Sequence, residues 1–294
     1  MRRLHMRLQT PPSSGQAPVL SGALLRANVD RLFGSAMYRP PMLPTVALRI
    51  LEHSRKPNVS YSEIVGLVES DPLFAASVLK IASSPVYASK AALRSIEQAL
   101  LRLGLTRLVD VCLEVALTGR IFRAPGFETA MEKLRRHSVA VAHTARLVAE
   151  RAGAIGDDTF TLGLLHEVGV VAGMIALATP ALWPEGVNKT GCLGVVGLER
   201  RELTERIVRA WTLPDSVGRA LVELARGTRP SDPVIAAVIL ADRIAETIGY
   251  ETPEDLPPCD SEVEEQAREI LGLRRLDLAD LEYLAKKHCS RFVC

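Results

Sequence analysis

Hydrophobic residues recur along most of this chain with the period of an α-helix. Valine, isoleucine and leucine fall three and four positions apart, rather than in the alternation expected of a half-buried strand. We therefore predict an all-α protein. In the first half we expect helices near residues 45–54, 60–69, 71–82, 95–103 and 106–122, and in the second half near 127–153, 158–178, 200–211, 214–226, 232–248, 261–271 and 278–288.

Capping and breaking signals support several of these boundaries. Asp71 precedes Pro72, and this pair is typical of a helix start, because proline lacks only an amide hydrogen that the first turn leaves unpaired. Ser95 and Gln98 have the spacing of a capping box, and Gly104 is a typical helix stop. The first half is therefore predicted to be a series of separately capped helices.

The two helices that meet at residues 103–105 have helix-turn-helix spacing, which is typical of a DNA reader. The second of them, however, is strongly apolar over residues 109–117. A recognition helix in a DNA groove needs a polar face, so we favour ordinary packing for this pair.

Changes in composition divide the chain into four parts. We expect residues 1–36 to be a flexible extension, with a mobile tail over residues 1–20 and room for a short helix over 21–33. The sequence Ala124-Pro125-Gly126 separates an N-terminal helical subdomain, residues 37–125, from a second one, residues 126–250. A proline-rich connector then leads into a C-terminal helical extension, so that the fourth part covers residues 251–294.

Charge and composition narrow the function classes. The chain has 294 residues, of which 48% are hydrophobic, and a formal net charge of +2 from 36 basic and 34 acidic residues. This balance gives no overall field that would attract nucleic acid. Five scattered cysteines form no Cys-x-x-Cys pair, so we expect reduced thiols in a cytoplasmic protein. The longest apolar run, residues 168–178, is shorter than the roughly 20 residues that cross a bilayer, and we expect no membrane span.

One histidine lies toward the buried face of the predicted helix over residues 127–153. At about 100° per residue, Leu134, Val141 and Val148 share one stripe, and His137 lies roughly 60° from its centre. His143 falls on the opposite side, so we expect it at solvent or at a helix edge. His137 is then either a core imidazole hydrogen-bonded to a backbone carbonyl or a metal ligand.

Three further polar residues interrupt apolar helices. His166 and Glu167 lie in an otherwise uncharged run over residues 161–178, and Asp242 follows the apolar run 234–241. A carboxylate in such a place must find a cation, a hydrogen-bond network or a metal ion, or become protonated. Imidazole and carboxylate ligands suit iron, manganese or zinc, which can acidify a bound water for attack on phosphorus. The alternative is an ion pair with an arginine such as Arg136 or Arg206, and spacing alone leaves both open.

Several sequence motifs lie between about residues 38 and 250. They are Leu43-Pro44-Thr45-Val46, Ser70-Asp71-Pro72-Leu73-Phe74-Ala75-Ala76, the segment 95–104, Arg136-His137-Ser138-Val139-Ala140-Val141-Ala142, the segment 162–169 and Trp211-Thr212-Leu213-Pro214. Their combination resembles the HDOD family, relatives of the HD and HD-GYP phosphohydrolases. The resemblance implies an all-helical fold in which an N-terminal helical subdomain packs on an HD-like helical bundle.

The same resemblance implies roles for the buried polar residues. His137 matches the first metal histidine of HD enzymes, His166 and Glu167 match their His-Asp doublet, and Asp242 matches the final aspartate. The chain departs from that pattern, because Glu167 is one methylene longer than aspartate and Val170 stands where HD-GYP enzymes have lysine. No histidine lies between His166 and His288. We therefore expect at most one weak metal position, for iron, manganese or zinc, and no required cofactor.

The resemblance implies a bacterial signalling protein that is regulatory rather than catalytic. We expect a protein partner that acts in trans, with a cyclic dinucleotide or another nucleotide as a second class of ligand. The alternative is a residual phosphohydrolase, in which His137, His166, Glu167 and Asp242 hold one metal ion. Its phosphate would then be positioned by Arg135, Arg136 or Arg200. A third hypothesis, nucleic-acid or nucleotide binding through Arg200, Arg201, Arg206 and Arg209, competes with a simple solvated helix face.

Overall fold

The computed structural model describes residues 42–290, except 57, 59, 85–86, 88–92, 120, 155, 157, 180–191, 212, 254–255 and 258–259, and also residues 27, 30, 31, 34 and 35. This part of the chain is all-α, as predicted, and contains no strand. Its helices are α2 (Thr45–Ser54), α3 (Tyr61–Glu69), α4 (Pro72–Ala82), α5 (Ile96–Thr118), α6 (Glu128–Ala152), α7 (Thr159–Leu165), α8 (Val168–Ala178), α9 (Cys192–Leu198), α10 (Arg200–Ala210), α11 (Asp215–Arg226), α12 (Pro233–Thr247), α13 (Ser261–Ile270) and α14 (Arg275–Cys289).

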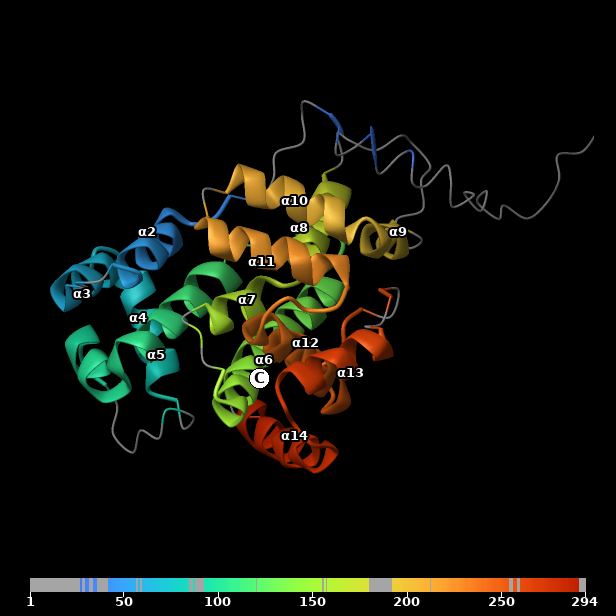
Figure 1. Ribbon diagram of the computed structural model, residues 1–294. Coiled ribbons are helices and arrows are strands. Elements are labelled where there is room, and N and C mark those ends of the chain that lie inside the picture. Colours follow the sequence, from blue (N-terminus) through green and yellow to red (C-terminus); the bar gives the residue numbers. More distant parts are fainter. Residues whose placement is uncertain are drawn as a thin grey trace, which may run out of the picture.

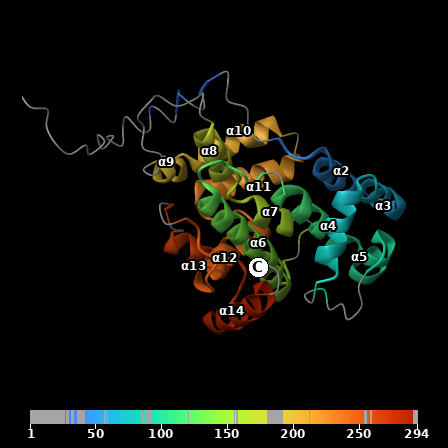
Figure 2. The ribbon, with the colours of Figure 1, turned by 180° about the vertical axis from the view of Figure 1, so that it is seen from behind.

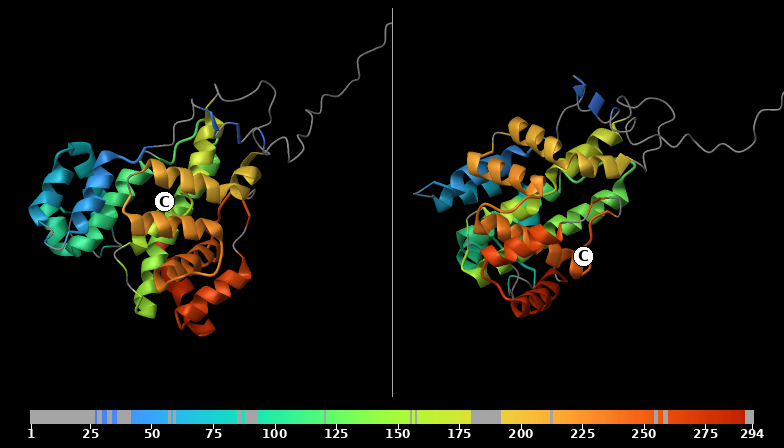
Figure 3. Two further views of the ribbon diagram at one scale, coloured as in Figure 1. Left: turned by 45° about the horizontal axis from the view of Figure 1, so that its top comes forward. Right: turned by 45° about the vertical axis from the view of Figure 1, so that its right-hand side comes forward.

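The helices form two lobes. Figure 1 shows α2 to α5 gathered at one side, with the remaining helices around α6 and α12, and the view from behind in Figure 2 shows the same division. The two views of Figure 3 show the first lobe projecting from the larger one. In the larger lobe α13 packs on α12, and α14 packs on α6 and α12. The C-terminal helices therefore cover the bundle that holds α6.

The two central helices of the larger lobe, α6 and α12, pack against each other, and both are rich in small buried residues. Alanines are fully buried along α6 and along α12: Ala140, Ala142, Ala145, Ala236, Ala237, Ala241 and Ala245. Helix α7 also lies tightly on α6, since a Cβ added at Gly163 would lie 2.7 Å from Cα of Ala142. This close approach brings the end of α7 to the middle of α6.

Most predicted boundaries agree with the structure to within a few residues, and Gly104 breaks α5 with a φ of 76°, as its stop signal predicted. The single helix predicted over residues 158–178 is wrong. It is interrupted by a turn at His166 and Glu167, so that α7 ends at Leu165 and α8 begins at Val168. The segment is apolar on all sides, so the pattern of hydrophobic positions gives no sign of the turn.

Other differences are smaller. Helix α5 ends at Thr118, before the predicted position 122, and α14 begins at Arg275 rather than 278. Helix α9 was not predicted, because Gly194 and Gly197 are weak helix formers. Gly197 has a packing reason, since an added Cβ would lie 2.6 Å from Cδ of Pro257. The tail over residues 1–20 lies outside the described residues, as does most of the helix predicted over 21–33.

A buried polar cluster joins the two lobes. Oδ2 of Asp110 on α5 lies 2.5 Å from Nε of Arg146 on α6, and Oε2 of Glu114 lies 3.2 Å from Nε2 of His143. The prediction that His143 faces solvent or a helix edge is therefore wrong. Glu114 of α5 pairs with it, the rings of Phe160 on α7 and His288 on α14 pack against it, and it is only 5% exposed. The same packing buries the second half of α5, which agrees with its apolar sequence and leaves no open helix face there for DNA.

One stretch of the described residues, Thr159–Ala178, is long and apolar enough to cross a membrane by length and composition alone. Its most apolar window is 94% buried inside the protein, as in the core helix of a soluble protein. The turn at residues 166 and 167 also divides it into two short helices.

The contact at Gly163 generates a stability prediction. Gly163→Ala should lower the free energy of unfolding by about 1–3 kcal/mol, because the added methyl group meets the backbone of α6. Gly66→Ala is the matched control, since an added Cβ there has nothing within 4 Å and alanine favours a helix interior. Urea unfolding followed by circular dichroism measures both. An unchanged midpoint for Gly163→Ala would show that α7 does not depend on this close approach.

Candidate metal centre

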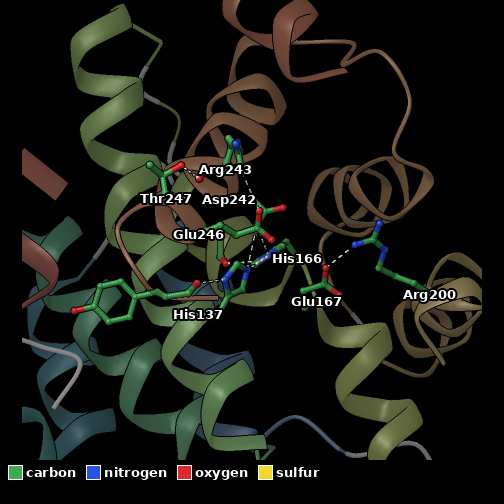
Figure 4. A network of polar contacts seen from close by, with 10 residues as sticks. His137, His166, Glu167, Arg200, Asp242, Arg243, Glu246 and Thr247 are labelled. Atoms are coloured by element: carbon green, nitrogen blue, oxygen red, sulfur yellow. Dashed lines mark hydrogen bonds and ion pairs between the residues drawn. The ribbon is translucent and has the colours of Figure 1, made fainter. Parts of the chain in front are cut away.

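Three helices bring two histidines and one aspartate to one point. His137 lies in the middle of α6, His166 directly follows α7, and Asp242 lies on α12. Nε2 of His137 lies 3.1 Å from Nε2 of His166 and 3.1 Å from Oδ1 of Asp242, and the remaining distance, from Nε2 of His166 to Oδ1 of Asp242, is 3.9 Å. Figure 4 shows these side chains pointing at one another. Both histidines are buried, with His137 fully inaccessible.

Backbone carbonyls fix the tautomer of both histidines. Nδ1 of His137 donates to the carbonyl of Tyr250 at 2.7 Å, and Nδ1 of His166 donates to the carbonyl of Gly163 at 2.8 Å. A carbonyl oxygen only accepts, so each neutral ring must carry its proton on Nδ1 and present a lone pair at Nε2. The predicted carbonyl-bonded core imidazole and the predicted ligand position therefore coincide at His137. Gly249, with a φ of 96°, turns the chain after α12 so that the Tyr250 carbonyl reaches His137.

Charge is distributed unevenly among the three groups. Burial lowers the pKa of His137, but the contact with Asp242, the charge of that aspartate and the Tyr250 carbonyl outweigh it, so the net pKa is raised. At His166 burial prevails over the attraction of Asp242, and the pKa is lowered. Burial alone would raise the pKa of Asp242, but His137, His166 and Arg200 lower it to about 2. Without a metal ion, the negative charge of Asp242 therefore favours a proton on His137.

The geometry fits a single metal ion. Oδ1 of Asp242 is buried and accepts no well-formed hydrogen bond within the described structure, which leaves an acceptor directed at the two imidazoles. An ion placed about 2.0–2.2 Å from each of three such atoms separates them by roughly 3 to 3.5 Å. Two of the three observed separations, both 3.1 Å, lie in this range, and the third, 3.9 Å, is longer. Imidazole and carboxylate are ligands of iron, manganese and zinc. His137, His166 and Asp242 would hold such an ion, in competition with the proton on His137.

Glu167, the fourth predicted ligand, lies outside this cluster. Its Oε1 accepts a hydrogen bond from Nη1 of Arg200 at 2.6 Å, and its Oε2 is buried without a partner in the described structure. The ion-pair alternative thus holds at Glu167, with Arg200 in place of the arginines considered from the sequence. Gly169 permits the contact, since an added Cβ would lie 2.5 Å from the backbone oxygen of Arg200 and 2.4 Å from Thr204.

The other predicted phosphate-binding arginines lie elsewhere. Arg135 forms two hydrogen bonds with Glu132 on the same helix, and the guanidinium of Arg136 lies 5.7 Å above the ring of Tyr250. The remaining three arginines of α10 pair within their helix, Arg201 and Arg209 with Glu205 and Arg206 with Glu202. These pairs are those of a solvated helix face rather than of a nucleic-acid interface.

A cavity of about 220 Å³ opens beside the cluster. His166 and Asp242 line it on one side, and Glu167 and Arg200 on another. Two further charged residues, Arg226 from the end of α11 and Asp260 from the start of α13, complete the polar lining. Neither was predicted, because nothing in their local sequence indicates that the ends of α11 and α13 meet this cavity.

The chain matches a protein-family model and a curated protein by sequence. The model of the HDOD domain matches residues 41–225. An uncharacterized protein of Treponema pallidum is 24% identical over 239 residues. That alignment covers 74% of this chain, and the chain spans 44% of the length of the curated relative it matches.

Solved structures confirm the fold. An HDOD domain protein of unknown function from Geobacter sulfurreducens superposes with a TM-score of 0.69 and 23% identity, covering 90% of this chain and 96% of the other. A provisionally named metal-dependent phosphohydrolase from Shewanella amazonensis gives 0.65 and 19%, covering 91% and 98%. A provisionally named signal transduction protein from Marinobacter aquaeolei gives 0.61 and 18%, covering 94% and 66%. At these identities the likeness concerns the fold alone.

The ligand geometry predicts how metal binding responds to substitution. We expect at most one divalent ion per chain, and His166→Ala should weaken its binding by about tenfold or more. Glu167→Gln should still bind the ion, because Glu167 is paired with Arg200 and is not one of the three ligands. His53→Ala is the control, since His53 lies outside the cluster. Titration of chelator-treated protein with Mn²⁺ or Zn²⁺, with elemental analysis, measures this. Equal loss in Glu167→Gln and His166→Ala would contradict the three-ligand assignment.

Proposed function

The chain belongs to the HDOD domain family, and from that premise we propose that it is a regulatory protein of bacterial signal transduction that acts by binding rather than by catalysis. The binding partner we propose is a signalling protein in trans, with a small anionic ligand in the cavity as the signal. The family match and the name of the Marinobacter aquaeolei structure support the signalling context.

The observation that carries the non-catalytic assignment is the pairing of Glu167 with Arg200. A 2.6 Å charge-assisted hydrogen bond holds the doublet carboxylate on the arginine and away from the three ligand atoms. Two imidazoles and one carboxylate then hold one ion at most, and the second ion of a binuclear phosphohydrolase has no ligand set among the described residues around the cavity.

The surroundings of the doublet support the same proposal. Val170, at the position where HD-GYP enzymes have lysine, is 1% exposed and packs in the core. A buried valine can neither bind phosphate nor transfer a proton. The position has thus become part of the packing between α8 and its neighbours.

A residual phosphohydrolase is the second candidate, and the convergence of His137, His166 and Asp242 favours it. A divalent ion bound there would supply a water acidified for attack on phosphorus. Arg200 and Arg226 would bind phosphate oxygens from the cavity wall. This candidate needs only one metal ion and the groups that the cavity already contains.

Turnover distinguishes the two candidates. We expect chain loaded with Mn²⁺, Fe²⁺ or Zn²⁺ to hydrolyse p-nitrophenyl phosphate, bis(p-nitrophenyl) phosphate and cyclic dinucleotides no faster than His166→Ala does, because Glu167 contributes nothing to the metal. His53→Ala, purified in parallel, controls for contaminating phosphatases. Metal-dependent hydrolysis that the wild type and His53→Ala share and that folded His166→Ala lacks would establish the phosphohydrolase instead.

A further inference from the structure

The cavity contains two arginines that reach it from different helices. Arg200 is the first residue of α10, and Arg226 is the last residue of α11, before Gly227 reverses the chain with a φ of 60°. Among the described residues Arg226 has one ion-pair partner, Oε1 of Glu205, at a distance of 3.9 Å, and the side chain of Arg226 is 47% exposed. Both arginines line the cavity, and guanidinium groups are well suited to bind the oxygens of a phosphate group.

The carboxylate of Glu167, which pairs with Arg200, is only partly hydrogen-bonded. Oε1 of Glu167 receives one hydrogen bond, from Nη1 of Arg200, whereas Oε2 is buried and receives none within the described structure. Burying a carboxylate is costly unless all its lone pairs are engaged. The ion pair is therefore incompletely stabilised, and an anion that engages Arg200 more fully can compete with Glu167, provided that the displaced Glu167 side chain leaves its buried position.

The charges around the cavity depend on Glu167. The lining carries two arginines and the carboxylates of Glu167, Asp242 and Asp260, and Asp242 is paired with His137 at 3.1 Å. The two arginines are then balanced by Glu167 and Asp260. Loss of the charge on Glu167, or its movement away from Arg200, would leave this side of the cavity positive.

We propose that the cavity is a binding site for a small phosphate-type oxyanion held by Arg200 and Arg226, and that Glu167 is its internal competitor for Arg200. The inference rests on the proposed function, because it names the class of ligand that the regulatory site binds. The volume of about 220 Å³ suits a phosphate or pyrophosphate group, since pockets for drug-sized molecules begin near 300 Å³. Binding of the anion releases Glu167, so that occupancy of the cavity is coupled to a change at the start of α8.

Calorimetric titration of the full chain with inorganic phosphate and pyrophosphate tests the site. A chelator first removes metal ions from the protein, and added chloride keeps the ionic strength constant. Glu167→Gln should bind both anions about tenfold more tightly than the wild type, because a like charge at this range shifts such equilibria by tenfold or more. When Arg226→Ala is added to Glu167→Gln, the affinity for both anions should fall by a similar factor. Glu202→Gln and Arg219→Ala, which remove the same charges from α10 and α11 outside this cavity, should leave the affinity of the wild type unchanged.

Arg200→Ala leaves Glu167 buried without its cation and can unfold the chain. The double variant Arg200→Ala/Glu167→Gln, which lacks both charges, is therefore measured beside it. Urea unfolding checks that each variant is folded. The folded double variant should lose the tight binding seen in Glu167→Gln. Affinity in Glu167→Gln no higher than in the wild type, or full affinity in the double variant, overturns the proposal. Phosphoester turnover would overturn the non-catalytic function and leave this site intact, whereas failure of the Glu167→Gln effect would overturn the site alone.

Discussion

Two buried imidazoles face each other through the nitrogens that carry their lone pairs, 3.1 Å apart, and a carboxylate oxygen points at the same place. Backbone carbonyls hold the opposite nitrogen of each ring, so neither histidine can turn its N–H toward the other without losing that bond. Three acceptors at this distance repel unless a cation lies between them. The interior of the larger lobe therefore requires a proton or a metal ion at one defined point.

The helices around this point are placed by close contacts that only glycine permits. Gly163 lets α7 approach the backbone of α6, which brings His166 to His137, and Gly169 lets α8 approach α10, which brings Glu167 to Arg200. The turn at residues 166 and 167 directs the two neighbouring side chains into different surroundings. The histidine joins the cation site, and the glutamate joins an arginine on the cavity wall.

This separation connects the packing of the bundle to its function. A carboxylate that is paired with an arginine is not available as a metal ligand, which argues for binding rather than hydrolysis. The same carboxylate also competes with external anions for the arginine. An ion pair of this kind responds to whatever competes for either partner. The cavity that holds this ion pair is therefore suited to respond to a bound anion, and α8, which follows Glu167, packs on α10, which begins at Arg200.

Local sequence patterns predicted the all-helical fold, most helix boundaries and the inward orientation of His137. They also identified His166, Glu167 and Asp242 as candidate site residues. Periodicity supports these predictions because it reports which face of a helix is buried. It does not report which element covers that face, so the burial of His143 under α5 was missed. A segment that is apolar all round has no preferred face, so the turn after Leu165 left no signal in its pattern.

The pairing of charges depends on how the helices pack. Glu167 and Arg200 are 33 positions apart, and Arg226 reaches the same cavity from another helix end. Such pairs depend on the crossing and distance of packed helices, which small residues set and which local sequence does not encode. Residue types therefore indicated that a polar site exists in this chain, and the packing of α7, α8, α10 and α12 divided it into a cation site and an anion-facing wall.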